Sequence, residues 1–343
     1  MLTFETKKKA VKKNIIQVLK ILIPVSLGVF LVVKIYNSLS IEQKDALFDA
    51  FREANYFWVV LSFFMGVLSH WIRGYRWKFQ LEAMGYTPST TNNFLAVMIG
   101  YVTNLVLPRV GEVSRAAAVS KYEKVPFQKS FGSILSERAL DMIILLIITI
   151  TTILLQFTLL EDFANDLGGK AMDKLNSPVL WILGGLALLC IPLFFYIIRR
   201  YRHLGFIAKI ANLVDGLLEG LRSIFKMKKR GAYLLATVGI WVLYVGMFWV
   251  NFLALEQTAD LSVNAVFAGF VLGSFAIVLI PGGIGAFPVG IMQALILYGI
   301  AEEIGFALGN LIWFSQTAMI VLVGGFSLLY MPIYNKRRVH VAT

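Results

Sequence analysis

Long apolar runs separated by short polar segments make up most of the sequence. Six runs, at about 15–34, 56–72, 138–160, 179–198, 232–255 and 304–331, have lengths near the roughly 20 residues that a helix needs to cross a bilayer. The pattern predicts an all-α polytopic integral membrane protein in which these six runs are full transmembrane helices. We expect residues 1–343 to form a single transmembrane domain.

Two further apolar segments, about 91–107 and 262–300, are interrupted by proline and glycine. Proline lacks an N–H group and ends or kinks a helix, and hydrocarbon cannot satisfy the backbone groups that such a break frees. Non-helical backbone is therefore expected only where protein buries it or water reaches it, so two breaks indicate a cavity. The residues expected at these breaks are Pro108, Gly111, Pro281, Gly282, Gly283 and Gly285.

Composition supports a membrane protein and the charges predict its orientation. Only 15% of the 343 residues are charged and the net charge is +12; a soluble domain carries about 25% charged residues. Lys and Arg of membrane proteins gather in cytoplasmic loops and near anionic headgroups, so the positive charge does not indicate nucleic-acid binding. Counting basic residues places both termini in the cytoplasm of a bacterial-type inner membrane.

All the strongly basic segments lie on the cytoplasmic side only when each interrupted segment enters and leaves the membrane on the same side. Segment 91–130 is then re-entrant from the cytoplasm and segment 262–300 re-entrant from outside. The alternative gives both segments full crossings, for eight or more spans, and places some basic loops less well.

A weak internal repeat relates the two interrupted segments. Gly100 and Pro108 enclose seven mostly apolar residues, as do Gly273 and Pro281. Transporters built from inverted repeats carry broken apolar segments at corresponding positions of two halves, with the substrate site between them. We therefore predict an inverted repeat.

Residues 203–228 predict an amphipathic helix. Apolar residues stand at 207, 210, 214, 217, 221 and 224, and polar residues occupy the other side. We expect an interfacial helix on the cytoplasmic surface; a linker packed against the spans is the alternative.

No pattern in the sequence predicts a metal site or a bound cofactor. The chain has one cysteine, Cys190, and three widely spaced histidines. The segment "PGGIGAFP" lacks the Lys-Ser/Thr pair of a phosphate-binding Walker loop, and neither H-E-x-x-H nor G-x-S-x-G occurs.

Charged residues cluster where the apolar runs end. Arg109, Glu112 and Arg115 stand three residues apart, so they lie near one face if 110–120 is helical. Glu137, Arg138 and Asp141 begin the next span. Ionisable residues in membrane segments usually face a cavity or one another.

Two interpretations of these charges stay open. In the first they are salt bridges that tie the hairpin to the next span. Glu112 pairs with Arg138, and Asp141 pairs with Arg109 or Arg115. In the second, which we favour, Arg109 and Arg115 bind a phosphate through bidentate donors while the carboxylates orient them.

Three motifs, "NLVLPRVGEVSRA", "SERALDMIILL" and "PGGIGAFP", resemble the flippase-like membrane domain of lysyl-phosphatidylglycerol synthases, the multiple peptide resistance factors. The resemblance implies one flippase-like transmembrane domain. The lysyl-transferring members add a cytosolic aminoacyl-transferase domain, whereas this chain stops at Thr343, so we do not expect aminoacyl transfer by this chain alone. The matching motif positions are Asn104, Pro108, Arg109, Gly111, Glu112 and Arg115, then Glu137, Arg138 and Asp141, then Pro281, Gly283 and Gly285.

We therefore predict a lipid translocase that moves a phospholipid or a polyprenyl-phosphate-linked lipid between leaflets. The headgroup site would comprise Asn104, Arg109, Glu112, Arg115, Glu137, Arg138 and Asp141. The alternative is a non-transporting membrane subunit that presents lipid to a separate aminoacyl- or glycosyl-transferase. An integral-membrane transferase that uses Glu112 or Asp141 as a base ranks below both, and the sequence predicts no oligomeric state.

Overall fold

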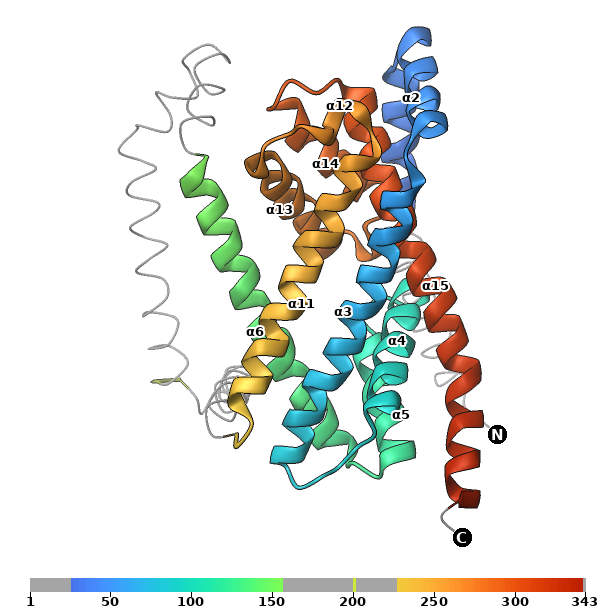
Figure 1. Ribbon diagram of the computed structural model, residues 1–343, viewed down its shortest axis with the longest axis vertical. Coiled ribbons are helices and arrows are strands. Elements are labelled where there is room, and N and C mark those ends of the chain that lie inside the picture. The colour runs from blue at the N-terminus through green and yellow to red at the C-terminus, as the bar shows by residue number, and fades with distance from the viewer. Residues whose placement is uncertain (1–25, 157–199, 202–226, 342–343) are drawn as a thin grey trace. The chain divides into compact units, whose positions relative to one another are not determined.

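The computed structural model describes residues 26–156, 200–201 and 227–341, and every regular element in these residues is a helix (Figure 1). The chain divides into two compact units. The first comprises Met1–Phe131 and Lys228–Thr343, and the second comprises Gly132–Met227. The described part confirms the predicted all-α class.

Most described helices belong to the first unit. A helix covers Ser26–Ser38, and α6 (Phe127–Leu155) begins in the first unit and continues in the second. The other elements are α2 (Ile41–Glu53), α3 (Tyr56–Ala83), α4 (Thr90–Val106), α5 (Gly111–Glu123), α11 (Arg230–Val250), η1 (Asn251–Ala254), α12 (Glu256–Ala259), α13 (Val263–Leu279), η2 (Pro281–Gly283), α14 (Ala286–Ile296) and α15 (Glu302–Val341).

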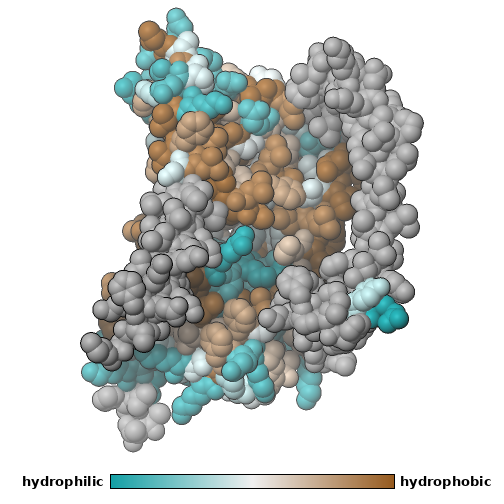
Figure 2. Space-filling model, turned by 180° about the vertical axis from the view of Figure 1, so that it is seen from behind, coloured by the Kyte–Doolittle hydropathy of each residue, from teal (hydrophilic) through white to brown (hydrophobic). Residues whose placement is uncertain are grey.

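Four described helices are long and apolar enough to cross a membrane, so the chain is a membrane protein. They are Tyr56–Ala83, Phe127–Leu155, Arg230–Ala254 and Glu302–Arg338, which confirms the spans predicted near 56–72, 138–160, 232–255 and 304–331. On the face in Figure 2, hydrophobic residues lie above and below a hydrophilic patch at mid-height, and further hydrophilic residues gather at both ends. The predicted span 179–198 lies outside the described residues, as do most of 15–34 and of the amphipathic segment 203–228.

Helix α3 extends well beyond the predicted end of its span at residue 72. Asn55 begins the helix by accepting a hydrogen bond from the N–H of Phe57. Its end comes at Ala83, where the Met84 N–H bonds to the carbonyls of Leu81 and Glu82. The segment "RGYRWK", which follows the predicted span, is therefore helical.

Helices α4 and α5 form a hairpin that turns back at the predicted break. The last turn of α4 ends with a hydrogen bond of 2.7 Å from the Leu107 N–H to the Thr103 carbonyl. Arg109 then takes a left-handed backbone conformation, with φ of 66°, and α5 begins at Gly111. A Cβ atom at Gly111 would overlap the carbonyl oxygen of Gly100, so glycine lets the two helices approach closely. We name residues 90–123 the first hairpin.

Helices α13 and α14 form a second hairpin, residues 263–296, around the other predicted break. Gly282, Gly283 and Gly285 all have positive φ, between 64° and 76°, a conformation that other residues rarely adopt. A Cβ at Gly273 would stand 2.8 Å from the ring of Phe287, which is another close approach between the two arms. The sequence correctly predicts where both helices break.

The two hairpins lie along the 40-residue helix α15 in opposed orientations (Figure 1). At its N-terminal end, α15 packs against α14, where a Cβ at Gly309 would stand 2.6 Å from the Cα of Pro288. At its C-terminal end, Asn335 binds Asn92 near the start of α4. Between these ends, Trp313 contacts the second turn and Gly324 contacts Val102 of α4. Each hairpin therefore has its base at one end of α15 and its turn toward the middle.

Candidate functional site

The turn of the first hairpin is organised by Asn104. Its Oδ1 atom accepts a hydrogen bond of 2.7 Å from the N–H of Gly111, the first residue of α5. Its Nδ2 atom stands 3.4 Å from a carboxylate oxygen of Glu112. Asn104 thus satisfies a donor at the start of α5, where backbone N–H groups lack partners within the helix. This predicted site residue holds the hairpin closed and orients Glu112.

Arg109 and Arg115 have different surroundings. Arg109 is exposed at the turn and precedes α5, so the predicted common helical face includes only Glu112 and Arg115. Arg115 is buried, and its guanidinium carbon lies 4.0 Å from the ring centre of Trp77 on α3. The ring of Trp77 fixes the plane of this guanidinium.

The second predicted group stands on α6. Glu137 and Asp141 are both buried and are four residues apart, which places them on the same face of the helix. Arg138 is half-buried. These three residues belong to the second unit, and their expected ion pairs with the first hairpin stay predictions.

The turn of the second hairpin is contacted by residues of other helices. The indole N–H of Trp313 on α15 donates a hydrogen bond of 2.8 Å to the Gly282 carbonyl. A Cβ at Gly285 would overlap the backbone of Gly28 in the helix Ser26–Ser38. A Cβ at Gly282 would stand 3.7 Å from the Leu105 side chain, so the two hairpin turns come close together. The cavity expected between them stays a prediction.

The structure adds a buried polar face on α3 that sequence reasoning missed. Arg73 is 2% exposed and donates to the Tyr244 hydroxyl from Nε at 3.2 Å and from Nη2 at 3.0 Å. Arg76 is fully buried and donates to the Thr237 hydroxyl at 3.2 Å. Both acceptors belong to α11, which packs beside α3. Two arginines within one span are costly in hydrocarbon, which makes them candidates for a functional role.

This polar face contacts both α4 and α11. The ring centres of His70 and Tyr101 on α4 are 4.4 Å apart. Gln80 donates a hydrogen bond to the hydroxyl of Tyr233 on α11. The opposite side of α3 is apolar and exposed, with residues every three or four positions: Phe57, Val60, Phe64, Leu68 and Trp71. Tyr75 stands four residues after Trp71 and continues this apolar spacing past residue 72. That continuation was the signal in the sequence for a longer helix.

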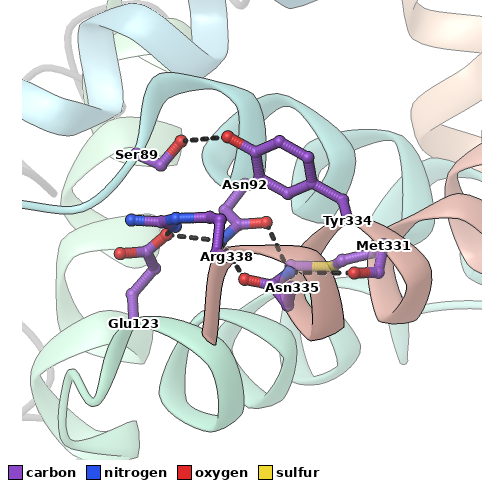
Figure 3. Close-up of polar contacts among 7 residues, drawn as sticks. All are labelled: Ser89, Asn92, Glu123, Met331, Tyr334, Asn335 and Arg338. Carbon is purple, nitrogen blue, oxygen red and sulfur yellow. Dashed lines mark hydrogen bonds and ion pairs between the residues drawn. The ribbon is translucent and has the colours of Figure 1, made fainter. Parts of the chain in front are cut away.

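A polar cluster fastens the base of the first hairpin to the end of α15 (Figure 3). Asn92 and Asn335 exchange two hydrogen bonds of 2.8 Å. Arg338 forms an ion pair of 2.7 Å with Glu123, the last residue of α5, and Glu123 also accepts from Asn92. Both arms of the hairpin are thereby attached to one helix. We name Asn92, Glu123, Asn335 and Arg338 the base cluster.

Among the described residues, no group of three or more His, Cys, Asp or Glu side chains is arranged to hold a metal ion. Around the first hairpin, guanidinium and amide donors accompany the carboxylates of Glu112 and Glu123. Such donors suit an oxyanion, above all phosphate.

Comparison with known proteins gives a family. The family model described as "Lysylphosphatidylglycerol synthase TM region" matches residues 17–324. A UPF0104 membrane protein of Methanocaldococcus jannaschii is 33% identical over 112 residues, which are 32% of this chain and 33% of the relative. The match thus spans about a third of that curated relative. No solved structure matches the chain.

Proposed function

Because the chain belongs to the lysylphosphatidylglycerol synthase transmembrane family, we propose that it is a lipid translocase. It moves a phospholipid or a polyprenyl-phosphate-linked lipid from one leaflet to the other. The headgroup passes between the two hairpins while the acyl or prenyl chains stay in the bilayer. The hairpins are re-entrant, each entering the membrane from a different side.

The observation that carries this proposal is the opposed arrangement of the two hairpins. Each is a broken helix, and their turns come close together beside the middle of α15. In secondary transporters, broken helices at the membrane midplane form the substrate site, and their rearrangement opens it alternately to each side. An assembly of full spans alone would have no such pair of breaks.

The first hairpin supplies the headgroup ligands in this proposal. Arg109 stands exposed at the turn and Arg115 stands on Trp77, so an anion can pass from the first guanidinium to the second. Glu112, held by Asn104, lies between them in the sequence and orients the arginines. Binding is by charge-assisted hydrogen bonds, with no covalent step.

The charges of the first unit support the proposed orientation. Lys336, Arg337 and Arg338 stand near the end of α15, and Lys121 and Lys124 stand at the base of the first hairpin, where Arg338 pairs with Glu123. Basic residues concentrate on the cytoplasmic side. We therefore place this end of α15, with the C-terminus, in the cytoplasm of a bacterial-type inner membrane.

Reconstitution in liposomes tests the proposal. The purified chain is incorporated into vesicles with a fluorescent anionic lipid, and the lipid's transfer between leaflets is followed by quenching of the outer leaflet. We expect the double variant Arg109→Ala/Arg115→Ala to be slower by about tenfold or more, since each change removes a charged donor to the headgroup.

The matched control is Arg52→Ala/Arg230→Ala, which removes two exposed arginines far from the turn. It should transfer lipid like the wild type. Equal rates for wild type and the Arg109/Arg115 variant would overturn the assigned site. A chain that binds lipid, transfers none and co-purifies with a soluble transferase would instead support a subunit that presents lipid to an enzyme.

A further inference from the structure

Helix α4 of the first hairpin is attached to α15 at two levels. At the first level, a Cβ on Gly324 of α15 would stand 2.7 Å from the Cβ of Val102 and 2.9 Å from the carbonyl oxygen of Met98, so the two helices are in direct contact there. At the second level, Asn335 exchanges two hydrogen bonds of 2.8 Å with Asn92. Since an α-helix rises about 1.5 Å per residue, the two levels are about 16 Å apart along α15.

The two attachments differ in kind. The contact at Gly324 is close packing of two helices, which opens only if the helices separate. The base cluster is polar and reaches the surface, because the side chain of Arg338 is 45% exposed while that of its partner Glu123 is 7% exposed. An ion pair with an exposed member adds little to stability, since water and ions compete for it. The base cluster is therefore the attachment that can break and form again while the packing at Gly324 persists.

Pro332 provides a point at which the end of α15 can bend. It stands inside the helix, before Asn335. Proline has no N–H, so the carbonyl of Leu328 in the preceding turn receives no hydrogen bond from this position, and a helix bends more easily there. Asn335 and Arg338 both follow Pro332. A change of helix direction at Pro332 therefore moves both α15 members of the base cluster and leaves Gly324 in place.

The bonds of the base cluster are linked to one another (Figure 3). Glu123 accepts hydrogen bonds from both Arg338 and Asn92, so one carboxylate joins the ion pair to the amide pair. Tyr334 lies beside them, with its hydroxyl oxygen 3.4 Å from that of Ser89. Hydrogen bonds that share a group strengthen one another, so these contacts form and break together.

We propose that the base cluster and Pro332 form a cytoplasmic gate. In the closed state, which the structure describes, the end of α15 binds both arms of the first hairpin. In the open state, the residues beyond Pro332 turn away, α4 loses its second attachment, and a lipid headgroup passes from the cytoplasmic leaflet toward the turn at Arg109. This inference rests on the proposed lipid-translocating function and identifies the movement that admits lipid from the cytoplasmic side.

Cross-linking of the full chain in liposomes tests the gate. With Cys190→Ser to remove the native thiol, the pair Asn92→Cys/Asn335→Cys is joined by a short bifunctional thiosulfonate, which ties α4 to the end of α15. We expect this cross-link to slow lipid transfer between leaflets by about tenfold or more, because a gate that cannot open limits the whole cycle. Reduction of the cross-link should restore the rate.

The matched control joins the two arms of the hairpin to each other. The pair Asn92→Cys/Glu123→Cys also replaces two members of the base cluster whose native side chains are in hydrogen-bond contact, but its cross-link leaves α15 free. Lipid transfer should be the same before and after this cross-link. Each comparison is made within one variant, so any effect of the substitutions themselves cancels.

A distance measurement follows the gate without any lipid transfer. Spin labels are placed on Arg230→Cys of α11 and Arg337→Cys of α15, two exposed positions, in the same background. Pulsed electron spin resonance then gives the distribution of distances between the labels, and the open gate should appear as a second distance. Asn335→Leu should raise the population of this second distance about tenfold, because it removes the amide pair. Pro332→Ala should lower it, because alanine restores the helix hydrogen bond. Asn310→Leu, whose native amide bonds only within α15, should leave both populations unchanged.

An unchanged rate after complete cross-linking of α4 to α15, or equal slowing in both cysteine pairs, would overturn the gate. So would a single distance that stays the same in Asn335→Leu and Pro332→Ala. If Asn335→Leu does not fold, Arg338→Gln replaces it, because the Arg338 side chain is exposed. If the wild type and every variant transfer no lipid, the proposed function fails, and the distances still decide whether the gate opens.

Discussion

The side-chain amide of Asn104 accepts a hydrogen bond from the N–H of Gly111, the first residue of α5. A helix start leaves backbone donors without partners, and hydrocarbon supplies no acceptor. Asn104→Leu keeps the approximate size of the side chain but removes the acceptor at 2.7 Å. We expect a loss of about 1–3 kcal/mol in the free energy of unfolding, the usual cost of leaving a buried donor unsatisfied.

Unfolding in increasing SDS measures this loss, and Asn310→Leu is the control. Asn310 of α15 donates only to the carbonyl of Phe306 within its own helix, so its replacement leaves no helix start without an acceptor. Similar midpoints for the two variants would contradict the role assigned to Asn104.

How far the sequence predicts individual site residues depends on how local their partners are. The break at Pro108 and Gly111 was predicted because proline and glycine stand together in one short segment. Arg73 was missed because a basic residue after an apolar run usually indicates a loop. Its partner Tyr244 lies 171 residues away, and no spacing within the segment reveals that contact.

At the scale of the elements, the close packing of α4 on α5 depends on a missing side chain. A Cβ at Gly111 would overlap the carbonyl oxygen of Gly100, which is backbone and cannot rotate away. Gly111→Ala should therefore separate the arms and destabilise the first hairpin by about 2 kcal/mol or more. The midpoint of SDS unfolding measures this effect.

Gly239→Ala on α11 is the matched control, because a Cβ there would meet nothing within 4 Å. Alanine is a better helix former than glycine, so this variant should be neutral or more stable by about 0.5–1 kcal/mol. Equal destabilisation of both variants would show that loss of glycine itself, not the contact with Gly100, matters.

The sequence predicts the positions of these elements better than their ends. Breaks at Pro108 and Pro281 follow from the chemistry of proline, and both hairpins turn there. The end of α3 at Ala83 was missed by eleven residues, because the packing of Arg76 and Gln80 against α11 makes a polar segment part of a buried helix face. Tertiary contacts, which a single segment does not contain, decide that boundary.

For the whole molecule, the second hairpin depends on α15 to hold its turn. Trp313→Phe removes the donor to the Gly282 carbonyl and keeps a ring in place. Since one hydrogen bond is worth about 1 kcal/mol, we expect amide hydrogen exchange across residues 280–288 to become about fivefold faster. Exchange at the base cluster should not change.

Trp241→Phe is the control for this variant. The indole N–H of Trp241 has no hydrogen-bond partner among the described residues, so only ring size changes. Faster exchange at 280–288 in both variants would contradict a specific tether from Trp313.

Helix α15 binds the base of one hairpin through Asn335 and Arg338 and the turn of the other through Trp313. The attachments are at different points of the two hairpins, the base of the first and the turn of the second. A shift of α15 along its axis would therefore displace the base of the first hairpin and the turn of the second together. While these attachments hold, the two hairpins are coupled mechanically and neither moves independently of the other.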